Sequence, residues 1–153
     1  AIHALEAGAV TEAVENVIEA NILMSGLGYQ NTGCSVAHAV NAGLTELEES
    51  APYLHGERVG FGVLVQFVFE NRSAQEIDDL VNYMTATGLP TTLEQVGVDY
   101  TRADRIGIMV DKIVHHNGTI YSEPLFVSED TVRAAILGAD AIGRAYRQGK
   151  RLL

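Results

Sequence analysis

The chain has 153 residues, the size of one ordinary domain, and its 47% hydrophobic and 20% charged composition is typical of a soluble, well-packed globule rather than a disordered chain. The formal net charge of −10 at pH 7 argues against a nucleic-acid partner, because phosphate binding needs clustered lysine and arginine. The single cysteine, Cys34, excludes an internal disulfide, and no apolar stretch is long enough to cross a membrane, so we expect a cytoplasmic protein without a membrane partner.

The first predicted helix starts after Thr11, which is placed to cap it, and runs to about Ser25 with apolar residues at helical spacing. The glycines that follow are expected to break it and form a loop before the next helix; they are Gly26, Gly28 and Gly33. A dinucleotide fingerprint is disfavoured here, because its glycines must follow a strand.

Two further helices are expected in the middle of the chain. One begins near Gly33 and carries the apolar residues up to Leu44, and the next opens at Gly56 after the loop at Pro52. The segment 61–69 within the latter is apolar on nearly every side, so we expect this helix to lie at the centre of the fold.

Capping signals mark the helices that follow. Ser73 followed by Glu76, and Thr91 followed by Glu94, are capping boxes, and Ser128 is placed to cap the last helix. The four expected helices lie at about residues 74–87, 92–96, 101–116 and 129–147. With no repeat and no domain linker, the sequence predicts one all-α domain over residues 1–153, built as an irregular helical bundle.

Two of the five histidines stand out as candidate metal ligands. His3 lies near a terminus, and His115 and His116 lie at a helix end, where imidazolium suits the helix dipole. His38 lies within a helix among small apolar neighbours, where an imidazole needs a partner, and His55 lies at a loop-to-helix junction. Because neutral imidazole is a common zinc ligand, the two could converge on one ion, although a catalytic zinc normally takes three protein ligands.

Several segments carry a recognisable combination of motifs. They are Val17–Tyr29 (VIEANILMSGLGY), Ala37–Val40 (AHAV), Gly43–Thr45 (GLT), His55–Gly62 (HGERVGFG), Gly88–Leu93 (GLPTTL), and Thr119-Ile120 before Pro124. Together they closely resemble the glycerol dehydrogenases, in the iron- or zinc-containing alcohol dehydrogenase superfamily, over nearly the whole chain.

The resemblance implies a two-domain enzyme of the dehydroquinate synthase-like fold. An N-terminal α/β domain, absent from this chain, binds NAD, and the C-terminal helical domain carries zinc. By the same resemblance His38 and His55 are zinc ligands, and Tyr29, His38 and His55 contact the substrate. The implied reaction oxidises glycerol, or a similar small polyol, to dihydroxyacetone, with hydride passing to NAD. The family forms ring-like oligomers, so a homo-oligomer is expected.

Two departures from the family pattern change these expectations. Asn41 stands where the family has a second histidine in His-Ala-Val-His-Asn-Gly, which leaves the exact polyol open. The family's third zinc ligand is an aspartate that precedes anything matching Ala1, as does the NAD domain. We therefore expect this truncated chain alone to bind zinc weakly, hold no NAD and catalyse nothing.

Two alternatives remain open. The segment His55-Gly56-Glu57 is also similar to dehydroquinate synthase, a relative with the same type of helical domain. From a different class comes a non-catalytic packing module, in which His38 and His55 would simply be hydrogen-bonded within a stable helical domain.

Overall fold

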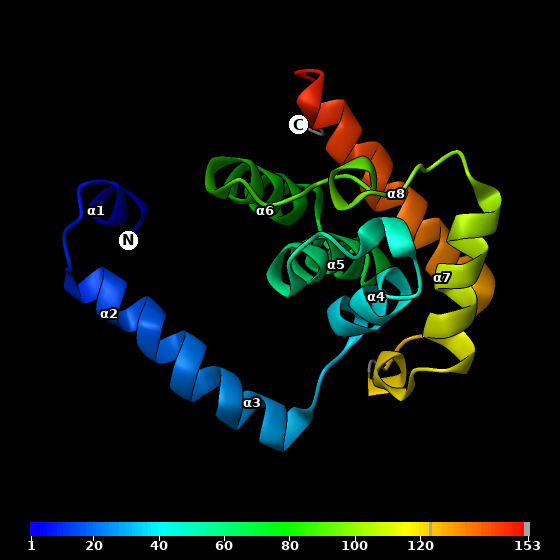
Figure 1. Cartoon of the computed structure of the whole chain (residues 1–153), viewed down its shortest axis with the longest axis horizontal. Helices are drawn as coiled ribbons and strands as arrows, with labels where there is room; N and C mark the ends of the chain where they lie inside the picture. Colours follow the sequence, from blue (N-terminus) through cyan, green and yellow to red (C-terminus); the bar gives the residue numbers. More distant parts are fainter. Residues whose placement is uncertain (123, 152–153) are drawn as a thin grey trace. The chain divides into compact units, whose positions relative to one another are not determined.

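The computed structural model describes residues 1–122 and 124–151, and within these ranges all regular secondary structure is helical, as the sequence predicts (Figure 1). The chain divides into two compact units, Ala1–Gly33 and Cys34–Leu153. The single domain over residues 1–153 that the sequence predicts stays a prediction. Val14 is the one buried side chain of the first unit, so this segment contributes little to a hydrophobic core.

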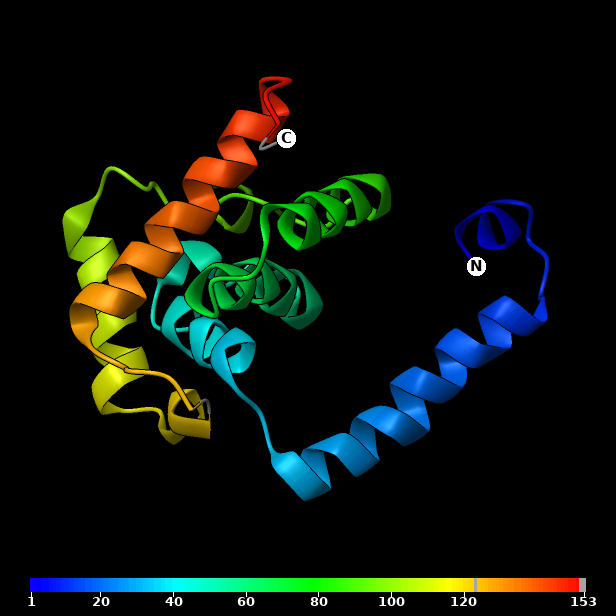
Figure 2. The ribbon, with the colours of Figure 1, turned by 180° about the vertical axis from the view of Figure 1, so that it is seen from behind.

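The first unit consists of a short helix, α1 (Ile2–Glu6), followed by one long helical rod (Figure 2). The rod contains α2 (Glu12–Glu19), a π-helical turn η1 (Ala20–Met24) and α3 (Ser25–Thr32). Its large apolar side chains are mostly exposed, among them Val17, Ile18, Ile22, Leu23, Met24 and Leu27. The expected self-association of the chain stays a prediction.

The predicted break at Gly26 is wrong, because the helix continues through Gly26 and Gly28 to Thr32. A glycine inside a helix costs only about 1 kcal/mol relative to alanine, so it does not forbid the helix. The rod ends at Gly33, whose positive φ of 72° is a conformation that favours glycine.

The second unit packs its helices around α5. Its elements are α4 (Val36–Leu44), η2 (Glu48–Ser50), α5 (His55–Phe69), α6 (Ala74–Thr87), η3 (Glu94–Val96), α7 (Ala103–His115), η4 (Gly118–Ser122) and α8 (Glu129–Arg147). Helix α5 contacts α4, α6 and α8, which confirms its predicted central position (Figure 1). Its apolar residues fill the core because helices cover it on several sides, and Phe61 and Leu64 are fully buried.

The capping signals give correct bounds for α6 and α8. Ser73 and Glu76 form the predicted capping box, and Gly88 ends α6 in a left-handed conformation. Ser128 accepts a hydrogen bond from the backbone of Thr131 at the start of α8.

The predicted capping box at Thr91 and Glu94 is wrong. The Thr91 backbone N–H and the hydroxyls of Thr91 and Thr92 instead donate to the side-chain oxygen of Gln95. Only the short 3-10 turn η3 forms there, and no α-helix spans 92–96.

A buried aspartate fixes this turn to α8. Asp140 is fully buried, and its carboxylate accepts a hydrogen bond from the backbone N–H of Leu93 at 2.9 Å and from Arg144 Nε at 2.7 Å. The Arg144 guanidinium in turn lies over the Tyr100 ring, 3.9 Å from its centroid. One carboxylate thus links segments 47 residues apart in the sequence.

No helix in the described ranges combines the length and the apolar character that crossing a bilayer requires.

Candidate metal centre

Helices α4 and α5 approach each other closely at one point. A Cβ atom on Gly62 would overlap the carbonyl oxygen of Ala37, so the contact requires a glycine. The side-chain oxygen of Gln66 accepts a hydrogen bond from the backbone N–H of Ala37 at 3.2 Å, which satisfies a donor that the first turn of α4 leaves unpaired. Sequence and packing therefore fix the start of α4 against the middle of α5.

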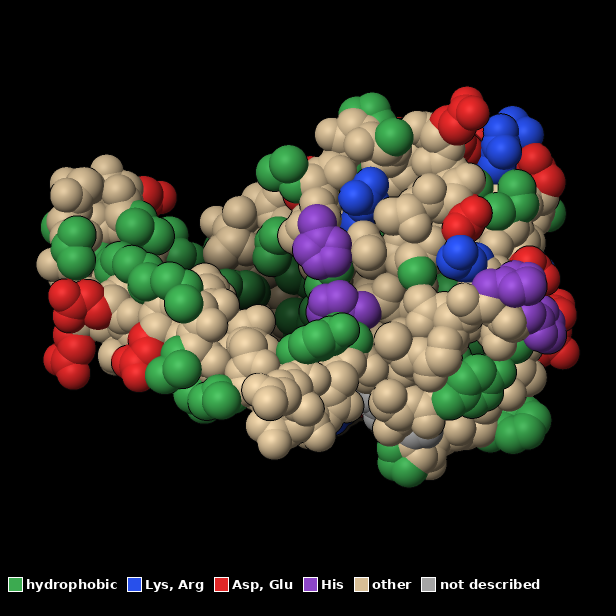
Figure 3. All heavy atoms as spheres, turned by 60° about the horizontal axis from the view of Figure 1, so that its bottom comes forward, with side chains coloured by type: hydrophobic (Ala, Val, Ile, Leu, Met, Phe, Trp, Pro, Cys, Tyr) green, Lys and Arg blue, Asp and Glu red, His purple; other side chains and the backbone are tan. Residues whose placement is uncertain are grey.

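This contact brings the two candidate histidines side by side. His38 follows Ala37 in the first turn of α4, and His55 is the first residue of α5. Their ring centroids lie 5.7 Å apart, with the planes tilted by 49°. His38 is partly buried and His55 is exposed, and histidine side chains reach the surface on the face that Figure 3 shows. The structure thus places together the two imidazoles that the sequence singled out.

Neither imidazole is bound to another protein group within residues 1–122 and 124–151, apart from their contact with each other. The packing-module alternative requires both rings to be hydrogen-bonded within the domain, and no such bond joins either ring to the described residues. The two rings are therefore available to a ligand from outside the chain.

Burial lowers the pKa of His38 below its ordinary value of 6.5, and the charge of the neighbouring His55 lowers it further. The imidazolium form is disfavoured because it loses hydration and faces a second cation. The neutral ring, which is the form that binds a metal ion, is favoured at neutral pH.

This shift predicts an acid-dependent loss of stability in the metal-free protein. A group whose folded-state pKa lies below its unfolded value of 6.5 binds more protons when unfolded, so the free energy of unfolding falls as the pH drops through 6.5. The loss is complete below the folded-state pKa. Urea unfolding with a chelator at about pH 7.5 and about pH 5.5 should show a larger fall in wild type than in His38→Gln. Equal falls in both proteins would contradict the assignment.

Asn41 and Arg58 lie one helical turn after His38 and His55, and sequence reasoning missed the contact between them. Arg58 Nε donates to Asn41 Oδ1 at 3.2 Å, and Arg58 Nη1 donates to the backbone oxygen of Ser50 at 3.1 Å. Asn41 follows His38 by three residues and Arg58 follows His55 by three, so each shares a helix face with a histidine. That repeated spacing is the one sequence signal that could have suggested the pair.

The two histidines form a partial donor set. No group of three or more metal-binding side chains occurs among the residues that the structure describes. Two neighbouring imidazoles, one of them favoured in its neutral form, fit two positions of a zinc site. A catalytic zinc normally takes three protein ligands. The third would have to come from outside this group.

The other predicted residues have more ordinary surroundings. His3, His115 and His116 each pair with a carboxylate at the surface, from Glu6, Glu129 and Asp111 respectively. Tyr29 lies in helix α3 of the first unit rather than in a loop, and its side chain is 67% exposed. Its role in binding substrate stays a prediction.

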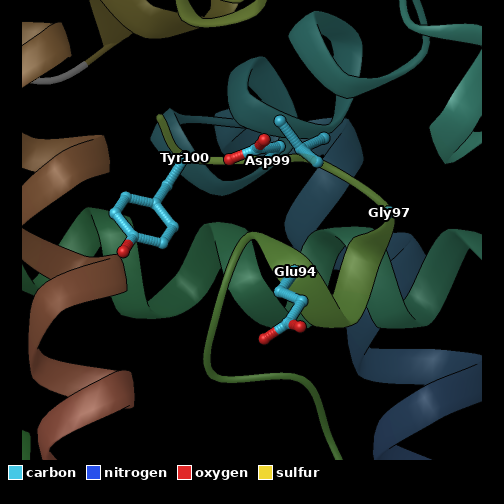
Figure 4. A pocket seen from close by; sticks show the side chains of 5 residues that line it. Glu94, Gly97, Asp99 and Tyr100 are labelled. Carbon is cyan, nitrogen blue, oxygen red and sulfur yellow. The ribbon is translucent and has the colours of Figure 1, made fainter. Parts of the chain in front are cut away.

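A hollow of about 390 Å³ opens elsewhere in the second unit (Figure 4). It is lined by Glu94, Gly97, Val98, Asp99 and Tyr100. Its two carboxylates point in different directions, and that of Asp99 accepts hydrogen bonds from the backbone and hydroxyl of Thr101. None of the predicted site residues lines it, so the hollow adds nothing to the histidine pair.

The fold and the site together define an all-α domain with two neighbouring imidazoles as a candidate for part of a metal site. Comparison with known proteins extends this description. The chain is 38% identical to the glycerol dehydrogenase of Citrobacter freundii over 143 residues, which is 94% of this chain and 39% of that protein. It is 39% identical to the glycolaldehyde reductase of Halobacterium salinarum over 147 residues, 96% of this chain and 40% of that one.

A solved structure gives the same result. The probable glycerol dehydrogenase of Sinorhizobium meliloti 1021 is 44% identical, with a TM-score of 0.85, over 93% of this chain and 40% of that one. No family model matches the sequence. The chain is thus a homologue of the glycerol dehydrogenases and corresponds to their C-terminal, helical part. It spans about 40% of the length of these relatives.

Proposed function

We propose that this chain is the zinc- and substrate-binding part of an NAD-dependent glycerol dehydrogenase, which oxidises glycerol or a similar polyol to the ketone dihydroxyacetone or its equivalent. The observation that carries the proposal is the pair of neighbouring imidazoles, His38 and His55, which have no other protein partner among residues 1–122 and 124–151. They occur in a chain that is similar to glycerol dehydrogenases over more than nine-tenths of its length.

In this proposal His38 and His55 supply two of the three protein ligands of the metal. Zinc, when bound, polarises the substrate oxygen and makes the alcohol a stronger acid. NAD would supply the hydride acceptor, and a nucleotide-binding part outside these 153 residues would hold it. Tyr29 lines the polyol pocket, and copies of the protein assemble into an oligomer in the cytoplasm. The 153 residues alone are not expected to catalyse the reaction.

The chain's own contribution is to hold the two imidazoles in place and in the neutral form. The close contact of Gly62 with Ala37 fixes their helices, and partial burial disfavours protonation of His38. A ligand pair held in this way loses little conformational freedom when a metal binds, which favours affinity.

Substitution of one imidazole tests the proposal. His38→Ala should lower the zinc affinity of the 153-residue chain by at least about 100-fold. Removing a group that only orients a metal ligand lowers affinity by about 10- to 100-fold, and loss of a ligand itself should have a larger effect. Affinity is measured by competition with a chromophoric chelator. The matched control is His115→Ala, which removes an exposed imidazole that pairs with Glu129 and should leave affinity unchanged.

Unchanged zinc affinity in a folded His38→Ala variant would remove the basis for the metal site. In that case the likeness to glycerol dehydrogenases would stand for the fold alone, and the packing-module interpretation would regain support.

A further inference from the structure

Arg58 joins three segments of the second unit around the histidine pair. From α5 its guanidinium donates through Nε to Asn41 on α4 at 3.2 Å, and through Nη1 to the backbone oxygen of Ser50 in η2 at 3.1 Å. Ser50 is fully buried, so its backbone carbonyl oxygen has little freedom to move. A single planar side chain thus connects α5 to both α4 and the turn that follows it.

The planar guanidinium gives this connection a defined geometry. Its donors lie in one rigid plane, so satisfying two acceptors at once restricts where each can lie. The bond to Asn41 is 3.2 Å long, near the upper end of hydrogen-bond distances, so a rotation of α4 about its axis that moved the Asn41 oxygen away would break it. The two hydrogen bonds therefore restrain α4 against turning about its own axis.

His38 lies between two such connections. On one side, the Ala37 backbone contacts Gly62 and is hydrogen-bonded to Gln66. On the other side, one turn later, Asn41 is held by Arg58. Core packing of α4 against α5 and α7 holds the helix as a whole. The hydrogen bond from Arg58 to Asn41 adds a polar restraint one turn beyond His38, on the same face of α4 as the ring.

We propose that Arg58 is a positioning residue, which through Asn41 and Ser50 sets the separation and tilt of the His38 and His55 rings and thereby their affinity for zinc. The effect on zinc rests on the proposed function, whereas the effect on the rings does not require a metal. Arg58 acts through the helices that carry the ligands, and it does not itself ligate the metal.

The test replaces Arg58 by glutamine in the full 153-residue chain. Two quantities are measured: zinc affinity by chelator competition, and the nuclear Overhauser effect between the ring protons of His38 and His55 in metal-free protein. We expect affinity to fall about 10- to 100-fold, the range for groups that orient metal ligands, and the ring-to-ring effect to disappear while the melting temperature is largely kept.

Two further variants sharpen the result. Arg72→Gln makes the same change of charge just beyond the end of α5, at an exposed residue paired with Glu70 and Glu76, and should change neither quantity. Arg58→Lys keeps the charge but replaces the planar fork by a single ammonium, so it should rescue affinity only in part.

A folded Arg58→Gln protein that keeps both the ring-to-ring effect and the zinc affinity would overturn the proposal. If Arg58→Gln does not fold, Asn41→Ala replaces it, because this variant cuts only the link to α4 and carries the same expectation. A folded His38→Ala protein that keeps the zinc affinity of wild type, while wild type shows the ring-to-ring effect, would reject the proposed function. The positioning role would then be supported by loss of that effect in Arg58→Gln.

Discussion

Gly62→Ala should destabilise the protein by about 3 kcal/mol, the upper part of the range for inserting a methyl group into a packed core. The added Cβ would overlap the backbone of Ala37, and backbone cannot move aside as a flexible side chain can. Helix α4 would have to shift away from α5, which would also separate His38 from His55. Urea unfolding followed by circular dichroism measures the change in the free energy of unfolding.

The same substitution elsewhere gives a control of opposite sign. Gly107 lies inside α7, and a Cβ there would meet nothing within 4 Å. Gly107→Ala should therefore stabilise the protein by about 0.5–1 kcal/mol, because alanine favours the helix. If Gly62→Ala proved as stable as wild type, the close approach of α4 and α5 would be wrong, and the positioning of the histidine pair with it.

Asp140→Ala should destabilise the protein by about 3 kcal/mol, at the lower end of the range for breaking a buried ion pair. The substitution leaves the buried backbone N–H of Leu93 without its acceptor and Arg144 without its carboxylate. Arg144 is 35% exposed, so water compensates part of the loss, which is why the lower end of the range applies. Thermal and urea unfolding measure the effect.

Two comparisons separate charge from hydrogen bonding at this position. Asp140→Asn keeps an acceptor for Leu93 but loses the charge opposite Arg144, so its effect should lie between wild type and Asp140→Ala. Asp79→Ala removes an exposed carboxylate from α6 and should change stability by no more than about 0.5 kcal/mol. A large effect at Asp79 together with a small one at Asp140 would contradict the burial and hydrogen bonds described for these residues.

Local signals predicted the helices of the second unit well. Ser73, Gly88 and Ser128 act within one turn of the helix ends that they define, so their effect can be read from neighbouring residues. The apolar character of α5 around its whole circumference likewise predicted its central position. The predicted convergence of His38 and His55 depended on family resemblance, because spacing alone does not fix how two helices pack.

The sequence predictions were wrong where one local pattern is compatible with more than one structure. Gly26 and Gly28 were expected to end a helix, but a helix can include glycine at a modest cost. Thr91 satisfied the capping-box pattern, yet Gln95 took the hydrogen bonds that the pattern assigns to Glu94. The contacts of Arg58 with Asn41 and of Asp140 with Leu93 join residues 17 and 47 positions apart, and no neighbouring residue indicates them.

The π-helical turn at Ala20–Met24 has a consequence for the direction of Tyr29. A turn of this kind accommodates one more residue than an α-helical turn, so the apolar faces before and after it lose their common phase by about 100°. Tyr29 therefore points away from the direction that an uninterrupted α-helical wheel drawn from Val14 would assign to it. The chemistry that an aromatic ring at this position could support depends on an irregularity of the backbone five residues upstream.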